Sequence, residues 1–196
     1  MTIYELKPQF QRLLSPAVNA MYRWGFTPNL VTILGFGVSI MIGVGAMQAI
    51  QNPMWALIWP AGLLLRMALN AIDGLMARRF NRQTKLGGVL NESMDILSDI
   101  VVTLPLLVLF PSLSVLIWIF IVQAVLMEGA GMLGYLSQVG RSYKGPLGKS
   151  DRAFMLGVLG ILVALGVPVG TYAFEVLVGL NLLIHIGFLN RLNHVW

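Results

Sequence analysis

The sequence predicts an all-α polytopic membrane protein, with six transmembrane helices and an amphipathic helix before them. The first observation is composition, because 57% of the 196 residues are hydrophobic and only 11% are charged. Soluble domains carry about 25% charged residues, so a soluble fold of this composition would lack polar side chains for its surface. The second observation is that the apolar residues form six stretches, each close to the ~20 residues of a membrane span. The third is that basic residues collect at alternate junctions between these stretches.

Residues 1–26 are expected to form an amphipathic helix at the membrane surface. Basic residues such as Arg23 are interspersed there with apolar ones such as Val18, a pattern typical of interfacial helices. The segment is too polar for a cleaved signal peptide. Thr27-Pro28-Asn29 then marks the start of the first span, because proline suits the first turn of a helix.

The six-helix bundle is predicted to occupy residues 27–196, and with the N-terminal helix it forms a single membrane domain, residues 1–196. Proline and glycine residues stand at several borders of the apolar stretches, where they mark turns. The predicted spans cover residues 29–50, 54–80, 86–110, 112–139, 150–166 and 169–191.

The distribution of lysine and arginine predicts the orientation of the bundle. The junctions at 51–53, 111–112 and 166–168 contain neither residue, whereas the junctions after the second and fourth spans are basic. Because cytoplasmic loops are enriched in Lys and Arg, both termini and the basic junctions are expected in the cytoplasm, at a bacterial inner membrane. The net charge of +5 therefore needs no nucleic-acid partner, and it favours anionic lipid headgroups. The basic junction residues are Arg78, Arg79, Arg82 and Lys85, then Arg141, Lys144, Lys149 and Arg152.

The strongest functional signal is a cluster of acidic residues where lipid-facing ones are expected. Four of the eight acidic residues lie between positions 73 and 99, and ionisable groups within spans usually face an interior or a wet cavity. Asn70 and Asp73 share one helix face, and Asn91, Asp95 and Asp99 share a face of the next helix. Because the two helices run antiparallel, we expect these faces to meet and to form a site of oxygen ligands, which suits Mg²⁺, Mn²⁺ or Ca²⁺. The alternative is that these groups only form hydrogen bonds between helices.

At these residues the sequence resembles the CDP-alcohol phosphotransferase family. The family pattern is Asp-x-x-Asp-Gly-x-x-Ala-Arg, then eight or nine residues, then Gly-x-x-x-Asp-x-x-x-Asp. This chain has the same spacing, from Asn70 to Arg78 and from Gly87 to Asp95. It departs from the pattern at Asn70 and Asn91, which replace the first and third carboxylates. Asparagine offers a hard cation a carbonyl oxygen but no charge, so metal is expected to bind more weakly, or one of the family's two ions to be absent.

The resemblance implies a phosphatidyltransferase of phospholipid biosynthesis. Such an enzyme moves a phosphatidyl group from CDP-diacylglycerol to a small hydroxyl acceptor and releases CMP, and family members commonly form homodimers. By the same resemblance, Asp73 and Asp95 are catalytic, with Asp95 as general base, and one or two Mg²⁺ or Mn²⁺ ions are the cofactor. The implied metal ligands are Asn70, Asp73, Asn91 and Asp95; the CDP-binding residues are Asn29, Thr32, Gly74, Ala77, Arg78 and Gly87; the acceptor-binding residues are Arg141, Lys149 and Arg152.

Two other ionisable positions lie deeper in the predicted spans. Arg66 precedes Asp73 by about two helical turns and Asp99 follows Asn91 by about two turns, so antiparallel packing brings them level. We predict a buried Arg66–Asp99 ion pair that braces the site without touching the substrate. Glu128 in the fourth span has two open interpretations, a residue that lines the cavity or the structural partner of a cation.

Three other functions stay open at this point. A transferase with CDP-choline-like donors and a lipid acceptor would share the motif. A catalytically impaired relative that binds lipid or CDP would account for the two asparagines. A cation transporter or channel, from a different class, would use the acidic cluster as its path and would give ion flux without CMP release. The transporter does not need Gly74, Ala77 and Arg78 at their observed spacing.

Overall fold

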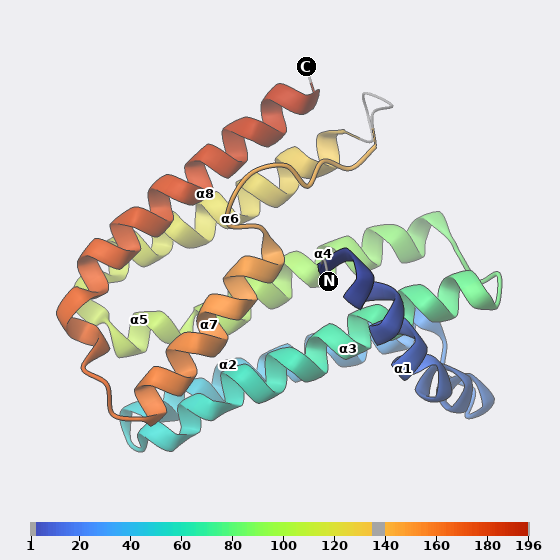
Figure 1. The fold of residues 1–196 in the computed structure, drawn as a ribbon, viewed down its shortest axis with the longest axis horizontal. Coiled ribbons are helices and arrows are strands. Elements are labelled where there is room, and N and C mark those ends of the chain that lie inside the picture. The colour runs from blue at the N-terminus through green and yellow to red at the C-terminus, as the bar shows by residue number, and fades with distance from the viewer. Residues whose placement is uncertain (1–2, 135–139, 196) are drawn as a thin grey trace.

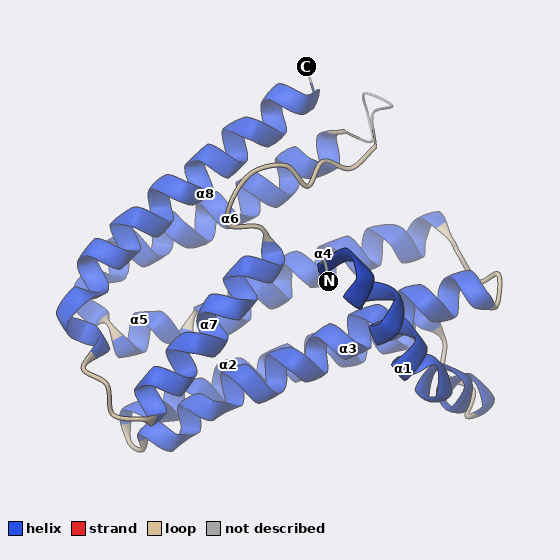
Figure 2. Ribbon diagram, viewed as in Figure 1, coloured by secondary structure: helices blue, strands red, loops and turns tan. Residues whose placement is uncertain are grey.

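The computed structural model describes residues 3–134 and 140–195, with the side chains of 10–134 and 140–194. Within these ranges all regular structure is helical, which confirms the all-α prediction (Figures 1 and 2). The end of the predicted fourth span, residues 135–139, lies outside the described residues. The α-helices are α1 (Ile3–Arg23), α2 (Pro28–Met47), α3 (Ile58–Arg79), α4 (Lys85–Thr103), α5 (Pro105–Leu109), α6 (Ser114–Leu133), α7 (Lys149–Ala164) and α8 (Ala173–Val195). Short 3-10 helices are η1 (Gln48–Ile50), η2 (Pro53–Leu57), η3 (Pro111–Leu113) and η4 (Val169–Tyr172).

Four helical segments in the described residues are long and apolar enough to cross a membrane, and the protein is a polytopic membrane protein. They are Pro28–Ile50, Pro53–Arg79, Pro111–Leu133 and Val169–His194. The other two predicted spans are not among them. The region of α4 and α5 carries several acidic side chains, and α7 is only 16 residues long and begins with charged residues. Two of the six predicted crossings therefore stay a prediction.

The predicted third span is interrupted, which sequence analysis did not anticipate. Helix α4 ends at Thr103 and α5 begins at Pro105, because proline has no N–H to donate to the carbonyl of Val101, four residues earlier. Helix α2 approaches closely at this point, since a Cβ atom at Gly43 would lie 2.8 Å from that carbonyl oxygen. The glycine thus allows α2 to pack tightly against the end of α4.

Helix α2 is the centre of the arrangement. It packs against α3 on one side and α4 on the other, while α7 packs on α3 and on η2. Helices α6 and α8 lie side by side as a separate layer, and α1 lies across α3 (Figure 1). The main buried cluster lies around the fully buried Trp59 and joins residues of α2 to α8 with η1 and η2.

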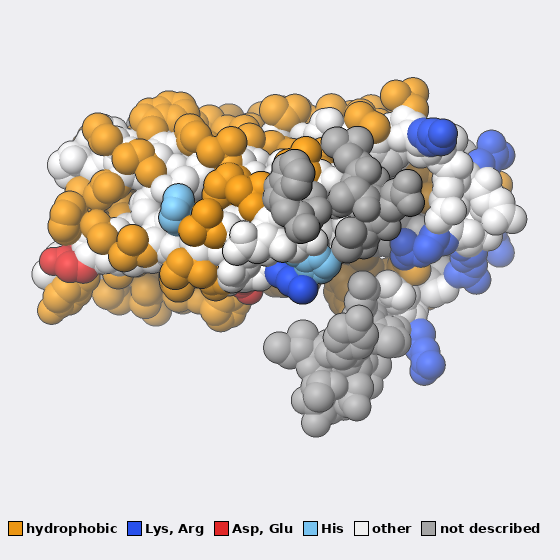
Figure 3. All heavy atoms as spheres, turned by 90° about the horizontal axis from the view of Figure 1, so that it is seen from above, with side chains coloured by type: hydrophobic (Ala, Val, Ile, Leu, Met, Phe, Trp, Pro, Cys, Tyr) orange, Lys and Arg blue, Asp and Glu red, His pale blue; other side chains and the backbone are white. Residues whose placement is uncertain are grey.

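The surface is divided between an apolar belt and a basic end. Hydrophobic side chains cover most of the face seen in Figure 3, and Lys and Arg side chains collect at one end of the molecule. Many large apolar residues on α2, α6 and α8 are exposed, for example Met41, Val115 and Leu182. Exposed apolar side chains in this number are expected where lipid is the solvent.

Candidate functional site

A cleft of about 290 Å³ opens between α2, α3 and α4. This volume is close to the lower end of the range for small-ligand sites, roughly 300–1,000 Å³. All six residues predicted to bind CDP line it, together with Asp73 and Asn91. The full lining is Pro28, Asn29, Thr32, Asp73, Gly74, Ala77, Arg78, Arg82, Gln83, Thr84, Gly87, Gly88 and Asn91.

The cleft is built to favour an anion. The N-termini of α2 and α4 both line it, and each is capped by a threonine: the Thr27 hydroxyl accepts from the N–H of Leu30 at 3.3 Å, and the Thr84 hydroxyl accepts from that of Gly87 at 2.9 Å. Helix N-termini carry partial positive charge and attract phosphate groups. The exposed Arg78 adds a full positive charge on the α3 side.

Two adjacent glycines at the start of α4 differ in their surroundings. A Cβ atom at Gly87 would lie 2.9 Å from both the Asn29 carboxamide oxygen and the Thr84 hydroxyl oxygen. A Cβ atom at Gly88 would meet nothing within 4 Å. The lack of a side chain at Gly87 therefore lets α4 approach the N-terminus of α2.

Two of the four predicted metal-binding residues line the cleft and two do not. Asp73 is 5% exposed, and one of its carboxylate oxygens accepts a hydrogen bond from the Thr32 hydroxyl at 2.8 Å. Asp73 and Asn91 line the cleft, whereas Asn70 and Asp95 do not. The Asn70 carboxamide N–H donates to Asp95 at 2.7 Å, and the second carboxylate oxygen of Asp95 forms an ion pair with Lys149. Both oxygens of Asp95 are therefore engaged by donors.

Helices α3 and α4 meet through their polar side chains, as expected, with Asn70 2.7 Å from Asp95 and Arg66 2.8 Å from Asp99. Both pack closely on α2, and within the described residues their backbones hardly approach one another. The physical reason is the glycine-rich surface of α2, since a Cβ atom at Gly35 would lie 3.3 Å from the Asn70 side-chain oxygen. Only side chains such as Asn70 and Asp95 bridge the space between α3 and α4.

The predicted pair of Arg66 and Asp99 is present as an ion pair of 2.8 Å. It is not isolated, because Arg66 also donates to the backbone carbonyl of Asp95 at 3.2 Å. Asp99 in turn accepts from Arg152 at 2.7 Å. Arg66 is only 3% exposed, so these contacts stabilise a charge that is removed from solvent.

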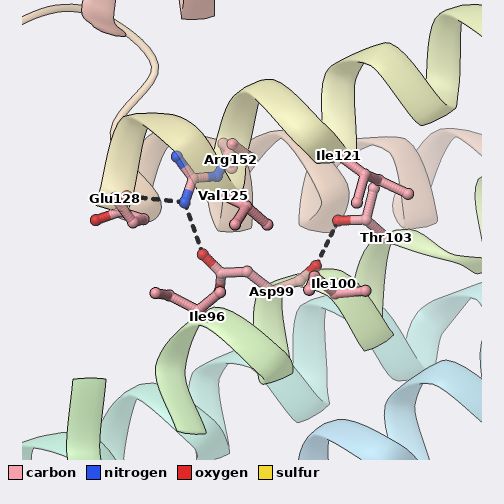
Figure 4. A pocket seen from close by; sticks show the side chains of 9 residues that line it. Ile96, Asp99, Ile100, Thr103, Ile121, Val125, Glu128 and Arg152 are labelled. Carbon is pink, nitrogen blue, oxygen red and sulfur yellow. Dashed lines mark hydrogen bonds and ion pairs between the residues drawn. The ribbon is translucent and has the colours of Figure 1, made fainter. Parts of the chain in front are cut away.

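The structure supports both interpretations of Glu128 on α6, as the partner of cations and as a residue that lines a cavity. It forms ion pairs of 3.0 Å with three arginines: Arg141, Arg152 and Arg191. It also lines a small cavity of about 10 Å³, in which Figure 4 shows Arg152 between Asp99 and Glu128. A cavity of that volume has room for about one water molecule.

The three predicted acceptor-binding cations all belong to this network. Lys149 pairs with Asp95, Arg152 with Asp99 and Glu128. Arg141 pairs with Glu92 and Glu128. Burial alone would lower the pKa of Arg141, but the carboxylate of Glu92 raises it above its usual value. These cations thus face carboxylates of the protein itself.

Sequence analysis missed Arg191, which is 2% exposed. Its guanidinium donates to the Met127 carbonyl at 3.0 Å as well as to Glu128. A basic residue after the last span reads as an ordinary cytoplasmic charge under the positive-inside rule. The only further signal was the unexplained acidic residue in α6 that it pairs with.

The predicted metal ligands offer only oxygen atoms. Within the described residues there is no group of three or more His, Cys, Asp or Glu side chains placed to hold a metal ion. Two carboxylates and two carboxamides remain, those of Asp73, Asp95, Asn70 and Asn91, and all offer oxygen, the ligand that Mg²⁺ and Mn²⁺ prefer. Mg²⁺ sites of this kind take one or two carboxylates and are completed by water and substrate phosphates.

The fold and the cleft define an integral membrane protein with an anion-favouring site at its basic end. The chain belongs to the CDP-alcohol phosphatidyltransferase family, whose sequence model matches residues 26–186. The resemblance inferred from the motif is confirmed at the level of the family.

The chain is similar in sequence to two relatives and shares its fold with two solved structures. The inner membrane protein YnbA of Escherichia coli K12 is 42% identical over 165 residues, covering 84% of this chain and 82% of YnbA. The archaetidylinositol phosphate synthase of Pyrococcus horikoshii is 30% identical over 97 residues, 48% of each protein. The fold is shared with the phosphatidylinositol phosphate synthase of Mycobacterium tuberculosis with CDP-DAG bound, at a TM-score of 0.78 and 24% identity over 94% of both chains. The same protein in complex with manganese and citrate gives a TM-score of 0.78 at 23% identity, over 92% of this chain and 88% of that one.

Proposed function

We propose that this protein is a phosphatidyltransferase, which moves the phosphatidyl group of CDP-diacylglycerol to a small alcohol and releases CMP. The observation that carries the proposal is the cleft, in which two helix N-termini and Arg78 face the buried carboxylate of Asp73. Family membership supports the CDP-linked donor. A solved structure of the same fold was determined with CDP-DAG bound, which supports a lipid donor.

In this proposal the cleft residues bind the donor. Arg78 and the N–H groups at the starts of α2 and α4 neutralise the diphosphate. Gly74 and Gly87 let the nucleotide lie close to the helix backbones. Phosphoryl transfer needs chiefly correct positioning and stabilisation of charge, and both are supplied by groups held on helices rather than on loops.

We propose that one Mg²⁺ or Mn²⁺ ion binds here, held by Asp73 and Asp95 with the carbonyl oxygens of Asn70 and Asn91. When bound, it supplies positive charge to the transferred phosphorus group and to the departing CMP. In the structure the Asn70 N–H points toward Asp95. Rotation of the carboxamide would turn its oxygen toward Asp95 instead, as a metal ligand requires. Lys149 already supplies one positive charge to Asp95, which supports one ion rather than two.

Asp95 acts as the general base in the proposed reaction. The acceptor hydroxyl gives its proton to Asp95 while its oxygen bonds to the phosphorus of the phosphatidyl group. The bond from that phosphorus to the oxygen of the CMP phosphate breaks, and CMP leaves with the electron pair. The ion pair with Lys149 holds the Asp95 carboxylate in place beside the cleft.

The topology follows from the same proposal. We place α4–α5 and α7 across the membrane as well, which makes six crossings with both termini and the cleft on the cytoplasmic side. The grouping of Lys and Arg at one end of the molecule supports this orientation (Figure 3). A bacterial inner membrane and a homodimer are part of the proposal, and the relative YnbA is named as an inner membrane protein.

The decisive test uses the purified full chain in detergent or nanodiscs with CDP-diacylglycerol, Mg²⁺ or Mn²⁺ and a panel of small alcohols. We expect CMP release that requires donor, acceptor and metal, and that stops when EDTA is added. Binding of CDP-diacylglycerol without CMP release from any acceptor would instead support the impaired relative. Cation flux into proteoliposomes without CMP release would support the transporter.

Two helix glycines, one that lines the cleft and one that does not, allow a matched test of the nucleotide site. We expect Gly87→Ala to raise the apparent KM for CDP-diacylglycerol about tenfold, because the added methyl group pushes α4 away from Asn29 and costs about 1.4 kcal/mol of binding. Gly37→Ala on α2 is the control, since its methyl group has open space and Gly37 does not line the cleft. Equal effects of the two substitutions would argue against a donor site between α2 and α4.

A further inference from the structure

The carboxylate of Glu128 occupies the centre of an arginine cluster. Arg141 comes from the segment after α6, Arg152 from α7 and Arg191 from α8, and each places a guanidinium nitrogen 3.0 Å from Glu128. Arginine clusters of this kind are the usual receptors for phosphate groups. Here an anion is already present, and it is a side chain of the protein.

Glu128 and its arginine partners are buried and held by further contacts. Glu128 is 4% exposed, and Arg152 and Arg191 are 6% and 2% exposed. The arginines are also held by backbone carbonyls: Arg152 donates to Leu147 at 3.1 Å, and Arg191 donates to Met127 at 3.0 Å. The arginine cluster thus forms an anion site that is occupied by the Glu128 carboxylate of the protein itself.

The charges of the ion-pair network nearly balance. Within the described residues the network holds five cations and four carboxylates. Lys149, whose side chain is 31% exposed, is the cation that a solute reaches most easily. The cations are Arg66, Arg141, Lys149, Arg152 and Arg191, and the carboxylates are Glu92, Asp95, Asp99 and Glu128.

We infer that the acceptor carries no phosphate group: it is a small alcohol of net zero charge, and Glu128 is the residue that sets this specificity. The inference rests on the proposed function. A phosphorylated acceptor would have to displace Glu128 from its three arginines, and the cavity beside Arg152 has room for about one water molecule. An uncharged alcohol needs only a hydrogen bond to Asp95 or Lys149 and leaves the ion pairs intact.

Binding tests the inference without relying on turnover. Glycerol 3-phosphate and glycerol are titrated into the full chain, in detergent with CDP present to fill the nucleotide cleft, and heat of binding is measured. We expect the wild-type protein to show no preference for the phosphorylated compound. Glu128→Gln keeps the shape but removes the charge, and we expect it to bind glycerol 3-phosphate at least about tenfold more tightly than wild type.

Controls separate this effect from a general change of charge or fold. Glu175→Gln makes the same substitution at an exposed position of α8, and we expect no gain in phosphate binding. Glu92→Gln removes one of the two carboxylates that pair with Arg141, so a smaller gain is expected, and this variant carries the test if Glu128→Gln does not fold. Wild-type preference for glycerol 3-phosphate, or no gain in either folded variant, overturns the inference.

The CMP assay provides the second arm and distinguishes the two proposals. We expect CMP release with an unphosphorylated alcohol to exceed that with its phosphate ester at least about tenfold in kcat/KM. CMP release with phosphate esters alone overturns the inference and leaves the proposed function standing. No CMP release with any acceptor overturns the proposed function, and the binding experiment then still decides whether Glu128 excludes phosphate.

Discussion

Asp95→Asn is expected to slow CMP release by about 10³-fold, because it removes both a general base and a charged metal ligand. The substitution changes one oxygen into an amide nitrogen and hardly alters the volume. Asn70 still finds an acceptor at position 95, whereas Lys149 loses the carboxylate with which it forms an ion pair. The measurement is the rate of CMP release at saturating CDP-diacylglycerol and acceptor, with the melting temperature recorded for each variant.

Asp151→Asn is the matched control for this experiment. Asp151 is exposed at the start of α7 and accepts a hydrogen bond from the N–H of Gly148 at 2.9 Å. Asparagine keeps that acceptor, so we expect CMP release within about twofold of wild type, as for most surface substitutions. If Asp95→Asn were as active as Asp151→Asn, Asp95 would be a structural partner of Lys149 and not the base.

The sequence predicted those features that depend on local pattern. Helical periodicity and the positions of proline placed most helix borders within a few residues, and the motif spacing brought all predicted CDP-binding residues into one cleft. Helical rise alone was enough to place Arg66 and Asp99 at the same depth, and the two side chains lie 2.8 Å apart.

Other features depend on which helices pack against one another, and the pattern of a single sequence does not specify this. The position of α2 between α3 and α4 follows from close contacts at Gly35 and Gly43, and glycines that permit such contacts look the same in sequence as any others. The pairing of Glu128 with Arg191 joins residues far apart in the chain through the packing of α6 on α8. Arg191 therefore appeared to be an ordinary charge at a membrane border.

Arg66→Met is expected to lower the free energy of unfolding more than a single substitution on the protein surface does. Methionine fills much of the same volume, but it leaves Asp99 and the Asp95 carbonyl without the donor that Arg66 supplies. Removal of one partner from a buried ion pair costs about 3–5 kcal/mol. The measurement is the midpoint of thermal unfolding in detergent, with CMP release at low temperature as a second readout.

Arg79→Met is the control, because Arg79 lies on the same helix but is exposed, and within the described part of the chain it donates to the Ser15 hydroxyl alone. Its loss should cost roughly 0.5 kcal/mol. The double variant Arg66→Met/Asp99→Leu removes both charges, and since Arg152 keeps its partner Glu128, we expect it to be more stable than Arg66→Met alone. Additive losses in the double variant would mean that the two residues are not energetically coupled. Neither Arg66 nor Asp99 lines the cleft. If the pair only stabilises the fold, the folded double variant is expected to keep the wild-type KM for CDP-diacylglycerol.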